Sequence, residues 1–499
     1  MRAFFSFLFM AVLLLLLTIK FGYEFGYNDQ VELLPYSYYL AHQQFYTHDF
    51  FIQGLHASLP NERTVMASVL LPFIDNIAWW NIVFHIATSL LLFAGLLRLA
   101  TLLSGSLFIA MLAVAISLVV LNDYGIGNNE VWTASFQASN LAAAIIVWCF
   151  YFYAKQYNTI AFLLLAVASI IQPLEGLNVF FGMVAFSLYN WRKTKQIQPK
   201  VVFAIALYLL TAGVFMLLLF MAKSNAQSSI NSADLFSILF LFRHPHHFIF
   251  SEFPIHKIAA TFLLGMAAAT LFFHQYTQLS FWIVFGLVGI LIYALFTDVL
   301  HFIPVANFQF YKVAQWIKFF GVVAMAKWLH SFLVVRFSER RLAALGVTAF
   351  LVILAFAFKN INSKQSLFWH GDADMVAICK QIEIETPVQA VFIQPFENTE
   401  LKWFGKRSSY VEFKANVRNK QFVGEWYRRL QEVYGITAND GVKGFALQQK
   451  ANYNFSHLNL QQLQHLKQEG VTHLLTFSSV KIDSLQPILQ NNSYAVYQL

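Results

Sequence analysis

Long apolar runs recur along the first 358 residues and are separated by short polar loops. A helix needs about 20 predominantly apolar residues to cross a bilayer, and by that measure the pattern predicts eleven spans. They cover residues 3–20, 80–103, 106–122, 134–154, 158–172, 175–191, 200–222, 257–274, 280–297, 314–334 and 342–358. The first run is longer than the apolar part of a secretory signal, and no small-residue cleavage pattern follows it. It therefore predicts a retained anchor.

The tail, residues 359–499, follows a different pattern. Helical periodicity marks residues 374–386, 425–435 and 459–470, whereas short apolar or alternating runs predict strands in 386–395, 407–414, 471–479 and 493–499. Helices that alternate with strands predict a small α/β domain. We therefore expect an α-helical polytopic membrane domain over residues 1–358 and a water-facing α/β domain over 359–499.

Composition supports this division. The chain is 58% hydrophobic and only 12% charged, whereas about a quarter of the residues of a soluble domain are charged. The net charge of +8 lies in short loops between apolar runs, so it reports membrane topology and predicts no nucleic-acid partner. The two cysteines form neither a disulfide framework nor a metal-binding pattern.

The distribution of charge predicts the orientation of the spans, because Lys and Arg are retained on the cytoplasmic side. With the N-terminus inside, Arg98, Lys155, Arg192 and Arg336 fall in inner loops, and nearly all acidic loop residues fall outside. This orientation places the tail outside the cytoplasm.

The first outer loop, residues 21–60, carries Asp29 and Asp49 among Tyr, Phe and His. A carboxylate near the membrane surface is costly unless it is solvated, paired or used. Two such groups predict an acid/base or metal-binding pair; the alternative is that they only solvate an outer loop. Between them, residues 31–46 predict a helix that lies in the membrane interface.

A second candidate group is FRHPHHF, which contains Arg243, His244, His246 and His247. Arg offers a bidentate donor fork, and His can donate a proton or bind a metal, so the group suits a phosphate or diphosphate. The alternative is an interfacial aromatic loop with a chance run of histidines.

Two further outer regions carry polar candidates. Glu130 and Glu175 stand where short helices meet Gly or Pro, and they predict either sugar-hydroxyl ligands or plain helix caps. His301 and Lys312 lie between the ninth and tenth predicted spans. Lys312 either clamps a lipid phosphate or, like Lys318, extends to the membrane interface.

A retained first span, an acidic outer loop, many further spans and an outer α/β domain together resemble the polytopic GT-C glycosyltransferase superfamily. The short motifs TPVQAVFIQP, KRSSYVEFK, GEWYRRL, YAVYQL, RHPHH and QPLEG resemble uncharacterised bacterial GT-C-like membrane proteins. The resemblance implies an inverting transfer of a hexosyl or pentosyl group from a polyprenyl-phosphate or polyprenyl-diphosphate donor. The acceptor would be a glycan, lipid or protein outside the cytoplasm.

By that resemblance Asp29 is the general base or a metal ligand, and Asp49 is the second acidic position. No DxD pair is present in the first loop, so a divalent metal, Mg or Mn, stays open as a cofactor. Arg243 and its histidines would bind the donor phosphate, and Lys406 and Arg407 of the outer domain would serve anionic acceptor sugars.

The resemblance also implies a place in cell-envelope polysaccharide biosynthesis, in a bacterial inner membrane with the tail in the periplasm or outside. Two other classes stay open, of which the first would use the same polar residues and the second would not need the loop carboxylates. One is a transporter or flippase of a lipid-linked intermediate, and the other is a non-catalytic accessory of envelope-polysaccharide assembly.

Overall fold

The computed structural model describes residues 2–122, 125–224, 230–358, 368–369, 372–482 and 485–499. Contacts divide the chain into two compact units. The helical unit comprises Met1–Tyr23, Asn81–Leu217 and His246–Trp369, and the mixed unit comprises Glu24–Trp80, Leu218–Pro245 and His370–Leu499. The predicted domain boundary follows residue 358, and the next residues, 359–367, lie outside the described residues. The division into domains 1–358 and 359–499 therefore stays a prediction.

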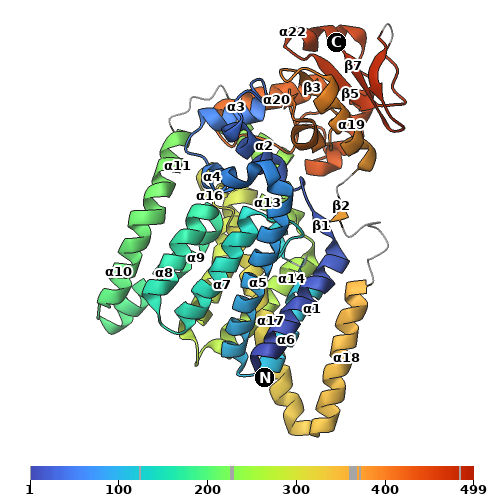
Figure 1. Ribbon diagram of the computed structural model, residues 1–499. Coiled ribbons are helices and arrows are strands. Elements are labelled where there is room, and N and C mark those ends of the chain that lie inside the picture. Colours follow the sequence, from blue (N-terminus) through green and yellow to red (C-terminus); the bar gives the residue numbers. More distant parts are fainter. Residues whose placement is uncertain (1, 123–124, 225–229, 359–367, 370–371, 483–484) are drawn as a thin grey trace. The chain divides into compact units, whose positions relative to one another are not determined.

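The helical unit is built from long helices joined by short turns (Figure 1). Its helices are α1 (Arg2–Phe21), α5 (Ile77–Ser104), α6 (Leu107–Ala115), α7 (Ala138–Ala154), α8 (Asn158–Ile171), α9 (Pro173–Thr194), α10 (Pro199–Tyr208), α13 (Pro245–Phe248), α14 (Ile255–Phe272), α15 (Thr277–Ala294), α16 (Ile303–Ala306), α17 (Ala314–Arg336) and α18 (Glu339–Phe358). The first residues of α5 and the greater part of α11 (Val214–Ser224) belong to the mixed unit. Short 3-10 or π-helical pieces are η2 (Ile116–Val120), η3 (Ile126–Asn128), η4 (Leu209–Gly213), η6 (Phe250–Glu252), η7 (Leu295–Val299) and η8 (Phe310–Val313), and β2 is Phe368–Trp369.

Each predicted span falls on one of these helices, so the predicted polytopic α-helical class is confirmed. Six stretches of the described residues are long and apolar enough to cross a membrane: Ala3–Phe21, Thr64–Ser104, Pro199–Ala222, Ile255–Phe272, Thr277–Val299 and Ile303–Arg336. Four shorter apolar helices accompany them: Leu107–Val120, Ala138–Ala154, Asn158–Ile171 and Leu345–Phe358. The protein is therefore an integral, multi-pass membrane protein.

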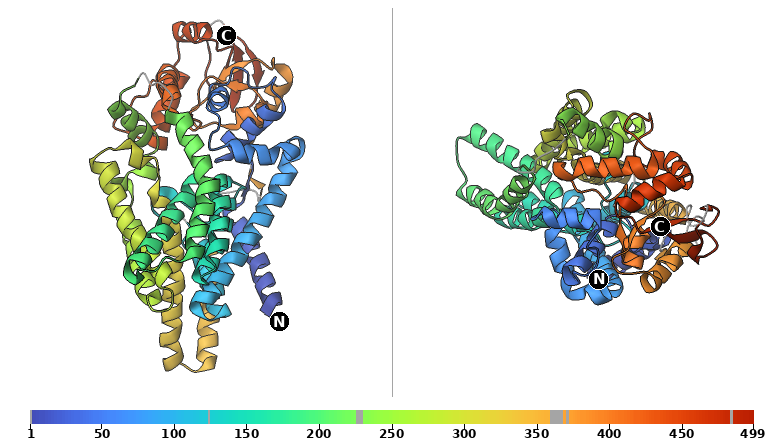
Figure 2. Two further views of the ribbon diagram at one scale, coloured as in Figure 1. Left: turned by 90° about the vertical axis from the view of Figure 1, so that its left-hand side faces the viewer. Right: turned by 90° about the horizontal axis from the view of Figure 1, so that it is seen from above.

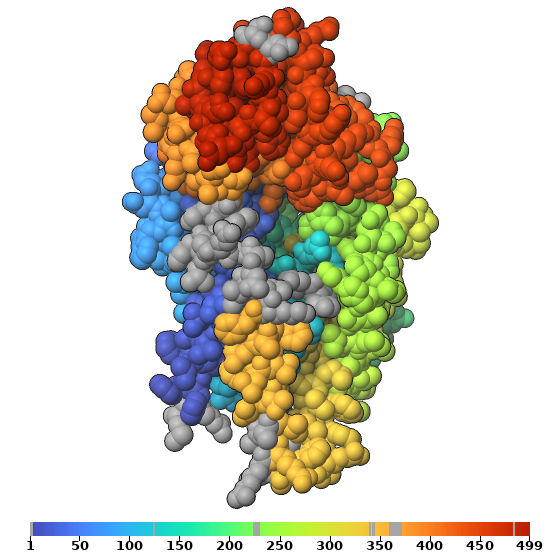
Figure 3. Space-filling model, turned by 90° about the vertical axis from the view of Figure 1, so that its right-hand side faces the viewer, coloured from blue at the N-terminus to red at the C-terminus, as the bar shows by residue number. Residues whose placement is uncertain are grey.

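Small residues let the helices of this unit approach closely. Helices α7, α8 and α9 pack against one another, and the side view of Figure 2 shows the long helices running lengthwise. A Cβ on Gly176 would stand 2.0 Å from the Ser169 Oγ, so only glycine allows this contact between α8 and α9. Figure 3 shows α18 beside α1 on the surface of the unit, and the two helices are in contact.

The break between the fifth and sixth predicted spans is explained by proline. Helix α8 ends at Ile171, Gln172 is extended, and Pro173 occupies the first turn of α9. Proline suits that position, because the first N–H groups of a helix have no partner within the helix.

The mixed unit combines the first outer loop with the tail. Its elements before the tail are β1 (Tyr23–Glu24), α2 (Gln30–Ala41), α3 (Phe50–Ala57), α4 (Thr64–Leu70), η1 (Leu71–Asn76), α12 (Ser232–Phe236) and η5 (Ser237–Arg243). Those of the tail are α19 (Ala373–Glu385), β3 (Val391–Ile393), η10 (Leu401–Gly405), β4 (Ser408–Ser409), α20 (Lys420–Tyr434), η11 (Gly444–Leu447), α21 (Gln448–Ser456), α22 (Leu460–Gln468), β5 (His473–Phe477), β6 (Pro487–Gln490) and β7 (Tyr494–Gln498).

The tail strands form one mixed sheet in the order β4-β3-β5-β7-β6. Strand β3 is parallel to β4 and β5, whereas β7 is antiparallel to β5 and β6. Helix α19 covers the sheet through Met375, Ile378 and Ile382, which pack with Phe392 and Val496 in one buried core. The predicted small α/β fold of the tail is thereby confirmed.

Two predicted elements are shorter than expected. The strand expected over 407–414 pairs only at Ser408–Ser409, and the helix expected over 31–46 ends at Ala41. Tyr46 has φ +56°, and Asp49 begins a separate helix, α3. The sequence pattern did not predict α3, α21 or β6.

Candidate functional site

Asp29 lies at the N-terminal end of α2 in the mixed unit, and its side chain is 42% exposed. Arg63, which directly precedes α4, places Nη1 4.0 Å from Asp29 Oδ2. The same guanidinium pairs with Glu32 in the first turn of α2, where Nε donates to Oε2 at 3.1 Å. Burial lowers the pKa of Arg63, but Glu32 and Asp29 raise it more, so Arg63 is a permanent cation here.

Arg243 ends η5 and is 2% exposed. Its Nη2 donates to the Lys414 carbonyl oxygen at 2.8 Å, and its guanidinium lies 4.3 Å from the centre of the Phe413 ring. Within the described part of the chain, Nε and Nη1 have no hydrogen-bond partner. Burial lowers the pKa of Arg243 to about 9, which leaves the side chain cationic at neutral pH. Arg243 is thus a buried cation with two nitrogens, Nε and Nη1, that donate no hydrogen bond to a described residue.

Lys414 connects the two groups. Burial is the main cause of its lowered pKa; the carboxylates Asp29 and Glu32 act against that shift, and Arg243 acts with it. Each of these groups therefore lies within electrostatic range of one ammonium. We call Asp29, Glu32, Arg63, Arg243 and Lys414 the open cluster. The structure thus brings Asp29 and Arg243 into one neighbourhood, while their roles stay predictions.

The histidines that follow Arg243 are divided between the units. His244 belongs to the mixed unit and is nearly buried, with Nδ1 3.4 Å from the Leu239 carbonyl oxygen. His246 and His247 belong to the helical unit, with ring centres 4.3 Å apart. The His247 Nδ1 lies 2.7 Å from the Gly127 carbonyl oxygen, which fixes that ring. A joint phosphate site of all four residues stays a prediction.

Asp49 has a different environment within the mixed unit. It is 0% exposed, and its oxygens accept hydrogen bonds from the Ile52 N–H at 2.9 Å and the Ser409 N–H at 2.8 Å. It therefore caps α3 and holds β4, which is a structural use of a carboxylate. Its predicted role as a second acidic residue of the site is not tested, but no Asp49 atom is accessible in this arrangement.

A buried ion pair completes that environment. Lys402 and Glu412, at 0% and 3% exposure, lie 2.5 Å apart. Burial lowers the pKa of Lys402, but Asp49 and Glu412 together raise it above its usual value. Burial raises the pKa of Glu412 to about 6, against the pull of Lys402. We call Asp49, Lys402 and Glu412 the closed cluster.

The helical unit holds the remaining candidates. Glu175, in the first turn of α9, pairs with Lys312 at 3.3 Å, so these two predicted residues do meet. Glu130 is exposed and accepts a hydrogen bond from Asn122 Nδ2 at 3.4 Å. His301 is exposed in a turn with φ +48°. The structure thus joins Glu175 to Lys312 and leaves Glu130 and His301 with separate local contacts.

Two predictions about basic residues are wrong. Lys318 does not extend to the interface: it is 2% exposed and donates to the carbonyl oxygens of Leu121 and Asn122 at 2.6 and 2.7 Å. Arg407 is also 2% exposed, and all three of its nitrogens donate to neighbours in the tail, so it is closed to an acceptor sugar. Lys406 is more accessible but pairs with Glu383 at 2.7 Å.

The sequence analysis missed the partners of these carboxylates. Arg63 in the open cluster and Lys402 in the closed one lie outside the motifs quoted above. Glu412 and Lys414 lie within KRSSYVEFK, but the sequence analysis gave them no role. Among the described residues, no group of three or more His, Cys, Asp or Glu side chains is arranged to hold a metal ion.

Comparison with known proteins gives a fold. A family profile described as a domain of unknown function (DUF6798) matches residues 373–433. No curated protein matches the sequence. A crystal structure of ArnT from Cupriavidus metallidurans bound to undecaprenyl phosphate superimposes with a TM-score of 0.52 at 10% identity, over 100% of this chain and 98% of that one.

A second solved structure is the archaeal oligosaccharyltransferase AglB from Archaeoglobus fulgidus, in complex with an inhibitory peptide and a dolichol-phosphate. It superimposes with a TM-score of 0.45 at 11% identity, over 95% of this chain and 70% of that one. The fold assignment rests on the first structure. The chain therefore has a GT-C-like membrane-protein fold, as the sequence resemblance implied.

Proposed function

We propose that this GT-C-like membrane protein is a glycosyltransferase. It would move a sugar from a polyprenyl-phosphate or polyprenyl-diphosphate donor to an acceptor outside the cytoplasm, with inversion at the anomeric carbon. The ligand of the ArnT structure, undecaprenyl phosphate, supports this class of donor. The observation that carries the proposal is the buried Arg243 guanidinium, which donates to the Lys414 carbonyl oxygen and whose Nε and Nη1 lack partners among the described residues.

Arg243 is suited to hold the donor phosphate. A buried donor without a partner costs about 1–3 kcal/mol, and a phosphate oxygen would satisfy it. The guanidinium forks match phosphate geometry, and the Phe413 ring beneath fixes the plane of the group. Arg243 would stabilise the charge that develops on the leaving phosphate in the transition state, and Lys414, in its protonated form, would add a second positive charge.

Asp29 is suited to take the proton of the acceptor. Unlike Asp49 it is 42% exposed, and Arg63 holds its side chain from one side. The acceptor oxygen forms a bond to the anomeric carbon as the bond from that carbon to the phosphate oxygen breaks. The hydroxyl proton passes to Asp29, and the polyprenyl phosphate or diphosphate leaves with the electron pair.

The position of the protein follows from the same proposal. The lipid tail of the donor stays in hydrocarbon, and its phosphate meets polar groups at the surface, so the reaction belongs at the outer face of the membrane. The loop charges of the sequence support that orientation. We place the protein in a bacterial inner membrane, with the tail outside the cytoplasm and a glycan, lipid or protein as acceptor.

The test uses membrane vesicles that contain the full chain and a labelled polyprenyl-phosphate sugar. Asp29→Asn should lower transfer by at least about 100-fold, because it removes the general base, and should leave the amount of folded protein unchanged. Asp75→Asn is the matched control, since Asp75 lies in the same Glu24–Trp80 segment of the mixed unit, and its side chain is 77% exposed and 3.1 Å from His42 Nε2. It should retain full transfer.

Transfer retained by Asp29→Asn would remove Asp29 from the catalytic role. Movement of the labelled headgroup across the membrane without any product would overturn the proposal in favour of a transporter.

A further inference from the structure

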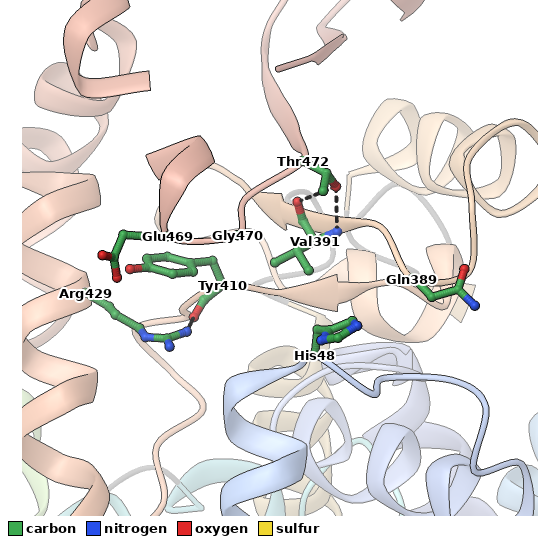
Figure 4. A pocket seen from close by; sticks show the side chains of 8 residues that line it. All are labelled: His48, Gln389, Val391, Tyr410, Arg429, Glu469, Gly470 and Thr472. Atoms are coloured by element: carbon green, nitrogen blue, oxygen red, sulfur yellow. Dashed lines mark hydrogen bonds between the residues drawn. The ribbon is translucent and has the colours of Figure 1, made fainter. Parts of the chain in front are cut away.

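An open cleft of about 490 Å³ lies within the mixed unit (Figure 4), and its lining includes no residue of the open cluster. Tyr410, Arg429 and Glu469 form one side of it, and His48 and Gln389 stand toward the other. None of these residues belongs to the proposed chemistry. The cleft therefore needs its own explanation.

One side of the cleft is rigid. The Arg429 Nη1 donates to the Tyr410 carbonyl oxygen at 3.0 Å, and its Nε donates to Glu425 at 2.7 Å. The guanidinium also lies 4.2 Å from the centre of the Tyr410 ring. A ligand meeting this side would find polar groups already oriented, which reduces the entropy cost of binding.

The other side offers groups that no neighbour uses. His48 and Gln389 are exposed, and neither makes a hydrogen bond to another described residue. Gln389 supplies both donors and an acceptor, and a neutral imidazole supplies one of each. Gly470, with φ +96° and open space where a Cβ would stand, leaves the cleft wide at its edge.

This lining matches a polyol. We propose that the cleft binds an oligosaccharide, which is the acceptor of the transfer reaction. The role of this oligosaccharide as the acceptor rests on the proposed function, whereas its binding to the cleft does not. Sugar hydroxyls both donate and accept, and the lining mixes amide, imidazole, guanidinium, carboxylate and hydroxyl groups around one buried aromatic ring.

A peptide fits this lining less well. Peptides that add to a sheet use a row of free backbone groups along a strand edge, with pockets for apolar side chains. The cleft instead lies where β3 begins, at Val391, and just before β5, at Thr472. Thr472 already bonds the Val391 backbone through Oγ1, at 2.9 Å to its N–H and 3.2 Å to its carbonyl oxygen. Among the described residues that line the cleft, Val391 is the one aliphatic side chain.

The test is saturation-transfer NMR on the full chain in nanodiscs, with a panel of neutral and acidic oligosaccharides and a panel of unglycosylated peptides. Empty nanodiscs give the background. We expect oligosaccharide signals from the wild type and a loss of at least about tenfold in affinity for Gln389→Trp, which fills the cleft, and for His48→Ala. Gln461→Trp is the matched control, because Gln461 is exposed on α22 and does not line the cleft.

Wild-type protein that binds no oligosaccharide above background, or binds peptides alone, would overturn the proposal. So would equal binding by Gln389→Trp and Gln461→Trp. The measurement needs no donor. An inactive protein that still shows cleft-dependent binding would therefore contradict the proposed function while supporting this inference.

Discussion

The open and closed clusters of the mixed unit both combine Asp, Glu and Lys, but their aspartates lie in different environments. In the closed cluster, Asp49 is 0% exposed and both of its oxygens accept backbone N–H groups, beside the buried Lys402 and Glu412. In the open cluster, Asp29 is 42% exposed, and Arg63 Nη1 stands 4.0 Å from its Oδ2. A carboxylate that is fully enclosed and satisfied stabilises the fold. One that is partly exposed is accessible to a substrate.

Two arginines of the same unit show the same contrast. Arg407 and Arg243 are both 2% exposed. All three nitrogens of Arg407 donate hydrogen bonds, including Nη2 to the Glu383 carbonyl oxygen at 2.7 Å. In Arg243, by contrast, Nη2 alone does so among the described residues. Buried polar groups of folded proteins are almost always paired, so the two Arg243 nitrogens support the proposed phosphate ligand.

The closed cluster predicts the largest effect on stability. Asp49→Ala removes one side of a buried ionic group and leaves the Ser409 and Ile52 N–H groups without an acceptor. The free energy of unfolding should fall by about 3–5 kcal/mol, which thermal or denaturant unfolding of the purified protein would measure. Asp75→Ala, at an exposed site of the same segment, should change it by less than about 0.5 kcal/mol. Equal losses in the free energy of unfolding for Asp49→Ala and Asp75→Ala would contradict the structural role of Asp49.

The two arginines predict a smaller effect that separates stability from binding. Arg407→Met removes several hydrogen bonds and should lower the free energy of unfolding by about 2–3 kcal/mol. Arg243→Met removes a buried charge with unused donors and should change stability by less than about 1 kcal/mol. It should, however, weaken binding of a polyprenyl phosphate by about 10- to 100-fold in a titration.

A stability loss for Arg243→Met as large as that for Arg407→Met, with phosphate binding intact, would show that Arg243 is structural.

Glu412 predicts the smallest effect, which depends on pH. Its pKa is raised on folding from about 4.5 to about 6, because burial disfavours the carboxylate more than Lys402 favours it. The folded state therefore holds this proton more tightly. That contribution to stability is full below pH 4.5 and is lost as the pH rises to 6, by about 2 kcal/mol at most. Glu412→Gln should flatten this part of the stability curve, and an unchanged difference between wild type and variant across pH 4.5–6 would contradict the shift.

The sequence predicted most of the fold because the responsible signals are local. Apolar length sets a membrane helix, so every predicted span lies on a helix. The alternation of helix and strand patterns revealed the tail, and Gly435 with φ +58° ends α20 where the sequence predicted. The sequence did not predict helix α21, because this helix is short and mostly polar, with Ala451 and Phe455 as its buried residues.

The candidate site could be predicted only in part. Asp29 and Arg243 stood out by residue type and neighbours, but their partners Arg63 and Lys414 come from distant segments that no local pattern joins. Asp49 shows the converse. Its sequence context resembles that of Asp29, and only the approach of β4 through Ser409 distinguishes a buried cap from an accessible acid.

The most direct test of the account is a cryo-EM structure of the full chain in nanodiscs with a bound polyprenyl phosphate. The account predicts phosphate density within hydrogen-bond distance of the Arg243 Nε or Nη1, with Lys414 as a second contact and Asp29 facing the site. Phosphate density elsewhere, with the Arg243 guanidinium unchanged, would contradict it.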